Sequence, residues 1–297
     1  MYDSMIKQIT AYLPPDLEQA VRALPREQLG RLEEIRLRIG CEAAAVIAGQ
    51  EQPLSLERRL ICTEQTLQHL LNAATGYSAY ASGEALRQGF LPLQGGHRLG
   101  LCGTAVLQDG RIATLKELSS ANLRVARQRT GCAEEALQLL GTLPENLLIL
   151  GPPGCGKTTL LRDLVRQLSD RLGQRVGLVD SRGELAACMG GQPQLNVGRR
   201  TDVISLAPME QGIELLLRVM NPQWIAVDEI TAEADAEAMM RASYCGVRLA
   251  ATAHAFDRRD LERRPLYRKL MALELFHHFI VLDREKRIRV ERMDAIC

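Results

Sequence analysis

The stretch NLLILGPPGCGKTTLLRDLVRQLSDRLG, residues 146–173, decides how this chain folds. It begins with an apolar run, 146–150, that predicts a buried strand, and it continues into an amphipathic run, 157–172, that predicts a helix. Between them GPPGCGKT (151–158) matches the phosphate-binding pattern G-x-x-x-x-G-K-[ST] in full. Because the pattern lies in the order strand, loop, helix that phosphate binding requires, the sequence predicts a nucleotide site.

Each residue type in this loop has a chemical use. The glycines let the backbone turn so that successive amides face the β-phosphate, and the helix N-terminus adds partial positive charge. Lys157 supplies a cation for the β- and γ-phosphates, the Thr158 hydroxyl can bind Mg²⁺, and Thr159 is expected at the α-phosphate. The predicted nucleotide-binding residues of the loop are Gly151, Pro152, Pro153, Gly154, Cys155, Gly156, Lys157, Thr158 and Thr159.

Two acidic residues and a histidine end later strands. Asp228 and Glu229 close the apolar run WIAVDE, and we expect Asp228 to bind the metal and Glu229 to polarise a water in line with the γ-phosphate. The alternative is a solvated carboxylate pair at the start of the next helix. His254, in AATAHAFD, is predicted to contact the γ-phosphate or the attacking water, the alternative being a histidine bonded to backbone.

A further acidic segment, VDSRGEL, supplies Asp180 and Glu184. We predict that one of them lies near the nucleotide. The alternative is a local ion pair with Arg182, and the spacing does not choose between these interpretations.

Strands and helices alternate along the second half of the chain, which is typical of a parallel sheet covered on both faces. A short helix is expected within 131–144, and REKRIRVERM (284–293) predicts a terminal hairpin. The predicted strands are 146–150, 175–180, 224–229, 248–254 and 277–284, and the predicted helices are 157–172, 208–220, 231–244 and 259–272.

The first half has a different pattern, that of a smaller α+β domain. Thr63 is a plausible N-cap for a helix over 63–76, and Asp109-Gly110 between two alternating runs predicts a hairpin within 95–118. We therefore predict two domains, 1–130 and 131–297. The other elements expected in the first are strands at 33–40, 41–49, 58–63 and 122–127 and a helix at 78–89.

Composition narrows the class of protein. The 297 residues are 46% hydrophobic and 25% charged, which is average for a globular chain and argues against disorder. A formal charge of +1 and only 4% aromatic residues argue against a nucleic-acid-binding surface. No apolar run approaches the ~18 residues of a transmembrane helix. The first ten residues, MYDSMIKQIT, lack the continuous apolar region of a signal peptide. We therefore expect a cytoplasmic protein.

Eight scattered cysteines include no CxxC spacing, which argues against a zinc ribbon or a disulfide framework. We expect reduced, mostly buried thiols. Cys155 lies inside the phosphate loop, and we expect its side chain to pack in the interior. The alternative is an exposed thiol beside a helix N-terminus, which would be open to oxidation.

With these residues in order, the chain resembles the ATPase superfamily of type II and type IV secretion systems, and more closely its sporulation subfamily in endospore-forming bacteria. The phosphate loop is too widespread to identify a family, whereas GGHRLGLCG together with SSANLRVAR is more specific. The resemblance rests on EEIRLRIG, YSAYASGEALRQGFLPLQGGHRLGLCGTAV, SSANLRVAR, GPPGCGKTTLLRDL, VDSRGEL, VDEI and TAHA. One departure concerns the acidic segment, which in the superfamily usually begins with adjacent acidic residues, whereas here Asp180 is followed by Ser181.

The resemblance implies a RecA-like P-loop core, preceded by a smaller α+β domain, that hydrolyses ATP with Mg²⁺. It also implies a hexameric ring in which the N-terminal domain moves against the core and pushes on a membrane-bound partner. In the sporulation subfamily the partners are membrane proteins of the channel between mother cell and forespore. The expected location is therefore the inner face of the mother-cell membrane that faces the forespore.

The resemblance also suggests a use for arginines of the first half. A guanidinium from another domain or subunit accelerates phosphoryl transfer when it meets the transition-state charge, and Arg98, Arg124 and Arg127 are candidates, Arg98 first. The alternative is strand-face arginines that are solvated or paired with Glu117. Two other functions stay open: a nucleic-acid-stimulated P-loop ATPase, and an ATP-gated scaffold with little turnover.

Overall fold

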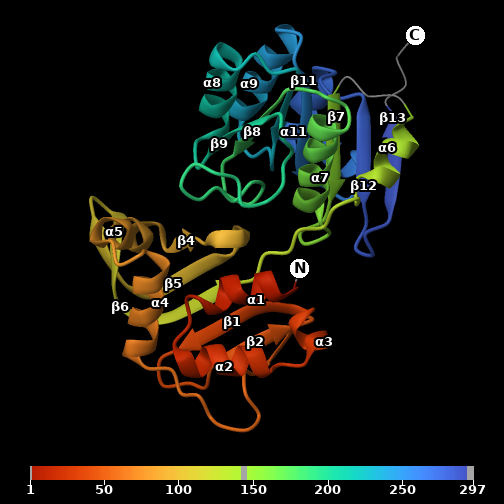
Figure 1. Ribbon diagram of the computed structural model, residues 1–297. Helices are drawn as coiled ribbons and strands as arrows, with labels where there is room; N and C mark the ends of the chain where they lie inside the picture. The colour runs from red at the N-terminus through yellow and green to blue at the C-terminus, as the bar shows by residue number, and fades with distance from the viewer. Residues whose placement is uncertain (1, 142–145, 293–297) are drawn as a thin grey trace. The chain divides into compact units, whose positions relative to one another are not determined.

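The apolar runs after residue 146 form one seven-stranded sheet in the computed structural model, which describes residues 2–141 and 146–292 (Figure 1). The strand order is β13-β12-β7-β11-β10-β8-β9, and neighbours run parallel except for the antiparallel pair β12 and β13. The strands are β7 (Asn146–Gly151), β8 (Val176–Asp180), β9 (Thr201–Ser205), β10 (Trp224–Val227), β11 (Arg248–His254), β12 (His278–Leu282) and β13 (Ile288–Arg292).

Helices cover both faces of this sheet because its central strands are apolar on both sides. Leu148 and Leu150 of β7 point into a cluster shared with α8, α9 and α11, whereas Leu147 and Ile149 point into a second cluster shared with α6 and α7. The helices of this part of the chain are α6 (Glu134–Leu140), α7 (Lys157–Asp170), α8 (Met209–Val219), α9 (Glu233–Tyr244), α10 (Arg258–Glu262) and α11 (Pro265–Ala272).

Most elements predicted for the second half are present, with three differences. The short edge strand β9 was not predicted, because its five residues are only partly buried and show no clear apolar alternation. The predicted helix 259–272 is two helices, since Pro265 cannot continue a helix in progress and instead begins α11. The predicted hairpin 284–293 is formed by β12 and β13, and its last residue, Met293, lies outside the described residues.

A second sheet, of six antiparallel strands, organises the first part of the chain in the order β3-β2-β1-β6-β5-β4. The chain divides into two units, Met1–Arg127 and Gln128–Cys297, with one sheet in each. The strands of the N-terminal unit are β1 (Leu32–Arg38), β2 (Ala44–Ile47), β3 (Gln50–Pro53), β4 (Phe90–Pro92), β5 (Arg98–Gln108) and β6 (Arg111–Arg124). Its helices are α1 (Tyr2–Thr10), α2 (Pro15–Ala23), α3 (Arg26–Leu29), α4 (Glu64–Ala74) and α5 (Ala79–Gln88), with the 3-10 turn η1 (Gln94–Gly96).

One face of the N-terminal sheet carries the core of its unit. Ile35 and Leu37 of β1 and Leu123 of β6 point into a cluster that also receives side chains of α1, α2 and α4. The opposite face is polar, and Glu34 of β1 lies there across from Arg124 of β6. These helices therefore cover a single face of the sheet.

Several elements of this unit differ from those predicted from the sequence. The predicted strand 58–63 is wrong, because that segment makes only an isolated bridge between Glu42 and Ile61, and the third strand is β3. The predicted strand 122–127 is the end of β6, a single strand that begins at Arg111. The three helices before β1 were not predicted.

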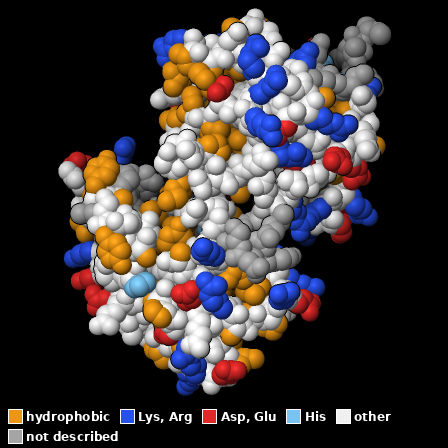
Figure 2. Space-filling view, in the orientation of Figure 1, with side chains coloured by type: hydrophobic (Ala, Val, Ile, Leu, Met, Phe, Trp, Pro, Cys, Tyr) orange, Lys and Arg blue, Asp and Glu red, His pale blue; other side chains and the backbone are white. Residues whose placement is uncertain are grey.

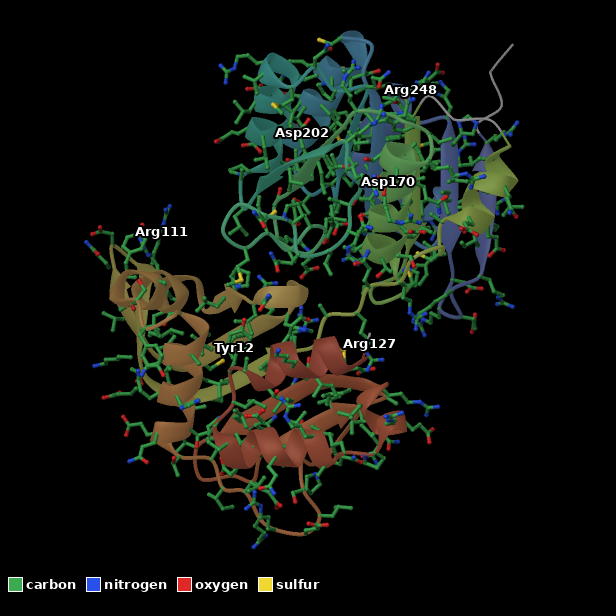
Figure 3. All side chains as sticks on the ribbon, in the orientation of Figure 1. Tyr12, Arg111, Arg127, Asp170, Asp202 and Arg248 are labelled. Carbon is green, nitrogen blue, oxygen red and sulfur yellow. The ribbon has the colours of Figure 1, made fainter. Side chains whose placement is uncertain are left out.

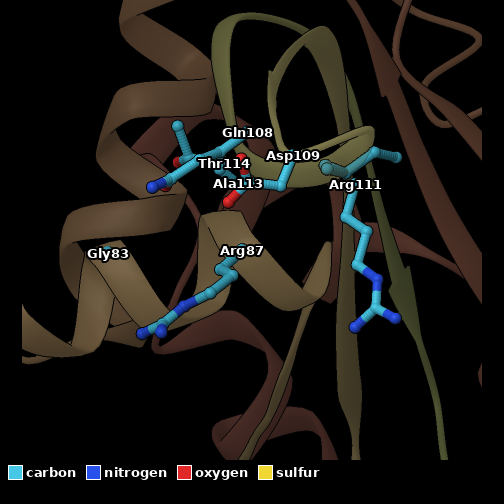
Figure 4. Close-up of a pocket in the computed structure, with 8 residues that line it drawn as sticks. Gly83, Arg87, Gln108, Asp109, Arg111, Ala113 and Thr114 are labelled. Carbon is cyan, nitrogen blue, oxygen red and sulfur yellow. The ribbon is translucent and has the colours of Figure 1, made fainter.

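The hairpin at Asp109-Gly110 is confirmed. Both residues have positive φ, 51° and 74°, as a two-residue hairpin turn of the right twist requires. Beside this turn lies a cavity of about 740 Å³ (Figure 4). It is lined by Gly83 and Arg87 of α5 and by the hairpin residues Gln108, Asp109, Arg111, Ile112, Ala113 and Thr114. The turn that sets the strand register therefore also shapes this cavity.

On the face shown in Figure 2, basic and acidic side chains lie next to one another in both units. Across residues 2–141 and 146–292, no helix combines the length and the apolar character that crossing a membrane would take.

His97 is buried where the turn before β5 meets the end of β6. Its Nδ1 accepts a hydrogen bond from the Ala126 backbone N–H at 3.0 Å, and its Nε2 has no partner among the described residues. Burial lowers the pKa of His97 to about 4, because the surroundings favour the neutral ring. The neutral imidazole thus ties two distant segments together.

Because an unfolded histidine has a pKa near 6.5, the unfolded chain takes up a proton between pH 6.5 and 4 that native His97 does not. His97 therefore makes the N-terminal unit less stable as pH falls through that window, by up to about 1.4 kcal/mol per pH unit. We expect His97→Gln to weaken this acid sensitivity, measured by hydrogen exchange of β5 and β6 amides at several pH values. His69→Gln is the control, and equal pH dependence in wild type and His97→Gln would contradict the assignment.

Candidate active site

The phosphate loop joins β7 to α7, and its first residue, Gly151, is closely packed against Cys155 and Leu282. A Cβ atom on Gly151 would lie 2.5 Å from the Cys155 sulfur and 2.8 Å from the Leu282 carbonyl oxygen, so only glycine fits. Gly156, directly before α7, has a φ of 105°, a backbone conformation that residues with a Cβ atom rarely adopt. The two glycines let the chain reverse from strand to helix within a few residues.

Lys157 is buried although it carries a charge, with only 6% of its surface exposed. Its ammonium has three acceptors: the carbonyl oxygens of Gly151 at 2.9 Å and Pro152 at 3.0 Å, and Nδ1 of His254 at 3.0 Å. Burial lowers the pKa of Lys157, while the nearby acidic groups act in the opposite direction. Because an ammonium only donates, His254 Nδ1 accepts and the ring proton is on Nε2.

Asp228 follows β10 and is held by two hydroxyls. The Thr158 hydroxyl donates to Oδ2 at 2.9 Å, and the Thr252 hydroxyl donates to Oδ1 at 2.6 Å. The same Thr252 oxygen accepts from the Glu229 backbone N–H at 2.9 Å. Thr252 therefore fixes both acidic positions at once.

Glu229 has φ of 42°, in the left-handed region that is uncommon for non-glycine residues. Successive residues of an extended strand point to opposite faces, and this turn of the backbone breaks the alternation after Asp228. Its Oε1 lies 3.1 Å from His254 Nε2, and its Oε2 accepts from Arg182. A continuous chain of contacts thus runs from Lys157 through His254 and Glu229 to Arg182.

Sheet topology explains why these residues meet. The phosphate loop follows β7, His254 is the last residue of β11, and Asp228 follows β10; in the sheet β11 lies between β7 and β10 and runs parallel to both. The carboxyl ends of parallel strands open at one edge, where ligands of such sheets bind. The structure therefore brings together the predicted residues Lys157, Thr158, Asp228, Glu229 and His254.

The donors beside the loop fit a magnesium ion. The hydroxyl of Thr158, the last residue of the loop motif, and the carboxylate of Asp228 are 2.9 Å apart. Mg²⁺ prefers oxygen ligands and is usually held by one or two protein groups, with waters and substrate phosphates completing its shell.

Asp180, at the end of β8, organises the loop that follows it. Its buried carboxylate accepts four backbone N–H groups, from Glu184 and Leu185 on Oδ1 and from Ala186 and Ala187 on Oδ2, at 2.8 to 3.2 Å. These bonds give Asp180 a structural role in the loop. The alternative in which Asp180 pairs with Arg182 is wrong, because Arg182 pairs with Glu229.

Arg162 of α7 holds the same loop from the other side. Its guanidinium donates to the Leu185 and Glu184 carbonyl oxygens, both at 2.6 Å, and burial lowers its pKa. The loop after β8 is thus fixed to the helix that begins at the phosphate loop.

The three candidate arginines of the N-terminal unit differ in their surroundings. Arg98 and Arg124 lie opposite one another on β5 and β6, with the Arg98 guanidinium 3.6 Å from the centroid of the Phe90 ring. Arg124 lies 3.7 Å from Glu34, which replaces the expected Glu117 as acidic neighbour. Arg127, labelled in Figure 3, donates to the Leu32 carbonyl oxygen at 2.7 Å.

The cysteines fit the expectation only in part. Cys155 is buried, which favours packing over exposure to oxidants. Among the described cysteines only Cys62 and Cys155 are buried, so the expectation of mostly buried thiols is wrong. The last of the eight, Cys297, lies outside the described residues.

Sequence reasoning missed Thr252, the contact of Arg182 with Glu229, and Arg162. The signal for Thr252 was available, because Thr252 and His254 are two residues apart on one strand and therefore share a face. The contact of Arg182 crosses 47 residues of sequence and leaves no local pattern.

Over residues 7–292 the sequence matches the family described as sporulation stage III, protein AA. The chain belongs to this family. It is 35% identical over 286 residues to stage III sporulation protein AA of Bacillus subtilis (strain 168), covering 95% of this chain and 92% of that protein.

Solved structures of an ATPase and of a pilus retraction motor resemble this member of the family in fold. The ATPase DotB of Legionella pneumophila aligns with a TM-score of 0.57 and 18% identity, over 88% of this chain and 76% of that one. The pilus retraction motor PilT, solved with bound ADP, aligns with a TM-score of 0.60 and 18% identity, over 84% and 74%. The mixed α/β arrangement with two sheets is therefore shared with these proteins.

We expect Asp180→Asn to destabilise the C-terminal unit by about 1–3 kcal/mol, because the amide turns a donor toward backbone N–H groups that lose their acceptor. The measurement is urea unfolding followed by fluorescence of Trp224, which is buried in this unit. Asp202→Asn, on the edge strand β9 (Figure 3), is the control and should change stability by less than about 0.5 kcal/mol. Equal stability of both variants would contradict the role given to Asp180.

Proposed function

We propose that this chain is an ATPase with a RecA-like core at 131–297 and a moving N-terminal domain at 1–130. One observation carries the proposal: the contacts that join Lys157, His254 and Glu229 at the carboxyl ends of neighbouring parallel strands. A phosphate loop alone indicates binding, whereas a carboxylate and a histidine beside its lysine indicate turnover.

Each residue at the loop has a part in the reaction. The Lys157 ammonium exchanges its three present acceptors for oxygens of the β- and γ-phosphates, while the loop amides and the start of α7 bind the β-phosphate. Glu229 orients and polarises the attacking water, and His254 contacts the γ-phosphate or that water. As the water oxygen bonds to the γ-phosphorus, its proton moves toward the Glu229 carboxylate, and the bond between the γ-phosphorus and the β,γ-bridging oxygen breaks, so that ADP and phosphate are the products.

Thr158 and Asp228 would hold Mg²⁺, which when bound neutralises charge on the β- and γ-phosphates. Asp228 is prepared for this by the Thr252 hydroxyl, which occupies Oδ1 and leaves Oδ2 directed at Thr158. Thr159 is proposed at the α-phosphate, and Glu184 is the acidic-segment residue that we propose near the nucleotide.

An arginine of the N-terminal domain completes the site in trans, with Arg98 the first candidate before Arg124 and Arg127. A guanidinium that meets the transition-state charge accelerates such reactions about 10³-fold or more. We propose that the protein forms a hexameric ring, so that the arginine of one domain or subunit reaches the nucleotide of another.

The proposed role is to power or assemble the channel between mother cell and forespore during sporulation. Its support is membership of the stage III sporulation protein AA family and the fold shared with a pilus retraction motor. The protein would act at the inner face of the mother-cell membrane, attached peripherally to membrane proteins of the channel. An ATP-gated scaffold and a nucleic-acid-stimulated ATPase are the alternatives.

We expect the wild-type protein to release phosphate from Mg-ATP. Glu229→Gln should still bind ATP and hydrolyse it at least about 100-fold more slowly, because the water loses its base. Lys157→Ala should lose nucleotide binding. The measurements are steady-state phosphate release and equilibrium nucleotide binding, with Arg241→Gln, which removes an exposed ion pair with Glu214 on α8, as the control.

Three results would contradict this assignment. Binding without turnover in the wild-type protein would favour the scaffold. Full hydrolysis by Glu229→Gln together with normal sporulation would contradict the role given to Glu229. Stimulation of the rate manyfold by single-stranded DNA would favour the nucleic-acid motor.

The membrane partners are tested in sporulating cells. We expect membrane proteins of the channel to co-purify with the wild-type chain and to be lost with Lys157→Ala, because ATP binding drives the association. Arg241→Gln is again the control. Retention of the same proteins by Lys157→Ala would show that the association does not depend on ATP.

A further inference from the structure

Arg182 reaches Glu229 from a tight turn after β8. The Gly183 backbone N–H donates to the Asp180 carbonyl oxygen at 3.2 Å, so Ser181 and Arg182 are the central residues of this turn. The segment that follows is fixed by the Asp180 carboxylate and by Arg162. The backbone that carries Arg182 is therefore held on its C-terminal side by buried hydrogen bonds.

The two oxygens of the Glu229 carboxylate have different partners. Oε1 contacts His254, whose other ring nitrogen is bonded to Lys157 at the phosphate loop. Oε2 accepts from Arg182 instead. Arg182 thus holds the oxygen that is not connected to the phosphate loop.

This arrangement suits a carboxylate that must orient a water. When phosphate oxygens replace the acceptors of Lys157, His254 loses its partner on Nδ1 and can turn toward the γ-phosphate. Oε1 then becomes available to a water, while the bond to Arg182 keeps Oε2, and with it the whole carboxylate, in place. A base that is oriented by a third group is a recurring feature of catalytic sites.

We propose that Arg182 is the positioning residue of Glu229, an inference that rests on the proposed ATPase function. It acts through the carboxylate and not on the nucleotide. Stability alone is a weak reason for this ion pair, because the Arg182 side chain is 53% exposed and exposed pairs contribute little.

The test compares Arg182→Gln and Arg182→Lys with the wild-type protein. We expect Arg182→Gln to lower kcat about tenfold or more and to leave KM within about twofold, because a displaced carboxylate misaligns the water without changing the phosphate contacts. Arg182→Lys should recover part of kcat, since an ammonium can still pair with Oε2. Arg241→Gln is the matched control, because its side chain is 49% exposed and pairs with Glu214.

A double variant shows whether Arg182 acts through Glu229. Arg182→Gln combined with Glu229→Gln should be no slower than Glu229→Gln alone. A further tenfold loss in the double variant would overturn the proposal, because it would mean that Arg182 acts on the nucleotide directly. An unchanged or increased kcat in Arg182→Gln would also overturn it.

A second measurement separates this proposal from the ATPase function. If wild-type protein released phosphate no faster than Lys157→Ala, the ATPase proposal would be wrong. The contact of Arg182 with Glu229 is then judged in nucleotide-free protein from the ¹³C NMR signal of the Glu229 carboxyl carbon. A shift of that signal in Arg182→Gln and none in Arg241→Gln would support the contact, and no shift in Arg182→Gln would overturn it.

Discussion

The burial of one lysine ammonium is the constraint on which the C-terminal unit depends. A buried charge is costly unless every donor finds an acceptor, and Lys157 satisfies three donors with two carbonyl oxygens of its own loop and one nitrogen of His254. The two carbonyl oxygens, of Gly151 and Pro152, reach the ammonium only because the loop turns tightly, and glycine at 151 permits this turn because a Cβ atom there would clash. The third acceptor requires that β11 lie beside β7, as it does in the sheet.

The acidic residues are placed by a second set of constraints. Asp228 and Glu229 are neighbours in sequence and would point to opposite faces of an extended strand. The left-handed backbone at Glu229 and the bridging hydroxyl of Thr252 bring both to the phosphate loop. Such local strain persists only where surrounding contacts determine it, and here the contacts come from α7, β11 and the turn after β8.

The sequence allowed accurate predictions where short-range rules operate. The phosphate loop, the Asp109-Gly110 hairpin and most strands after residue 146 follow from glycine positions and apolar runs, which act over a few residues. The failures were elements with weak local patterns: the partly buried edge strand β9, the helices before β1, and the segment 58–63. The spacing did not choose between Asp180 and Glu184 as the residue near the nucleotide, and the four backbone hydrogen bonds of Asp180 arise from the path of a loop that has no sequence signature.

The sequence by itself determined that a strand, a glycine-rich loop and a helix follow one another, and that Lys157, Asp228, Glu229 and His254 each lie at the end of an element or within two residues of one. Those features depend on backbone geometry and hydrophobic periodicity, which are local. Only the tertiary structure decided which of these side chains meet, that the Thr252 hydroxyl joins the Asp228 carboxylate to the Glu229 backbone N–H, and that Arg182 pairs with Glu229 across 47 residues. The physical reason is that hydrogen bonds depend on distances of about 3 Å, which strand order and loop path set and no local pattern records.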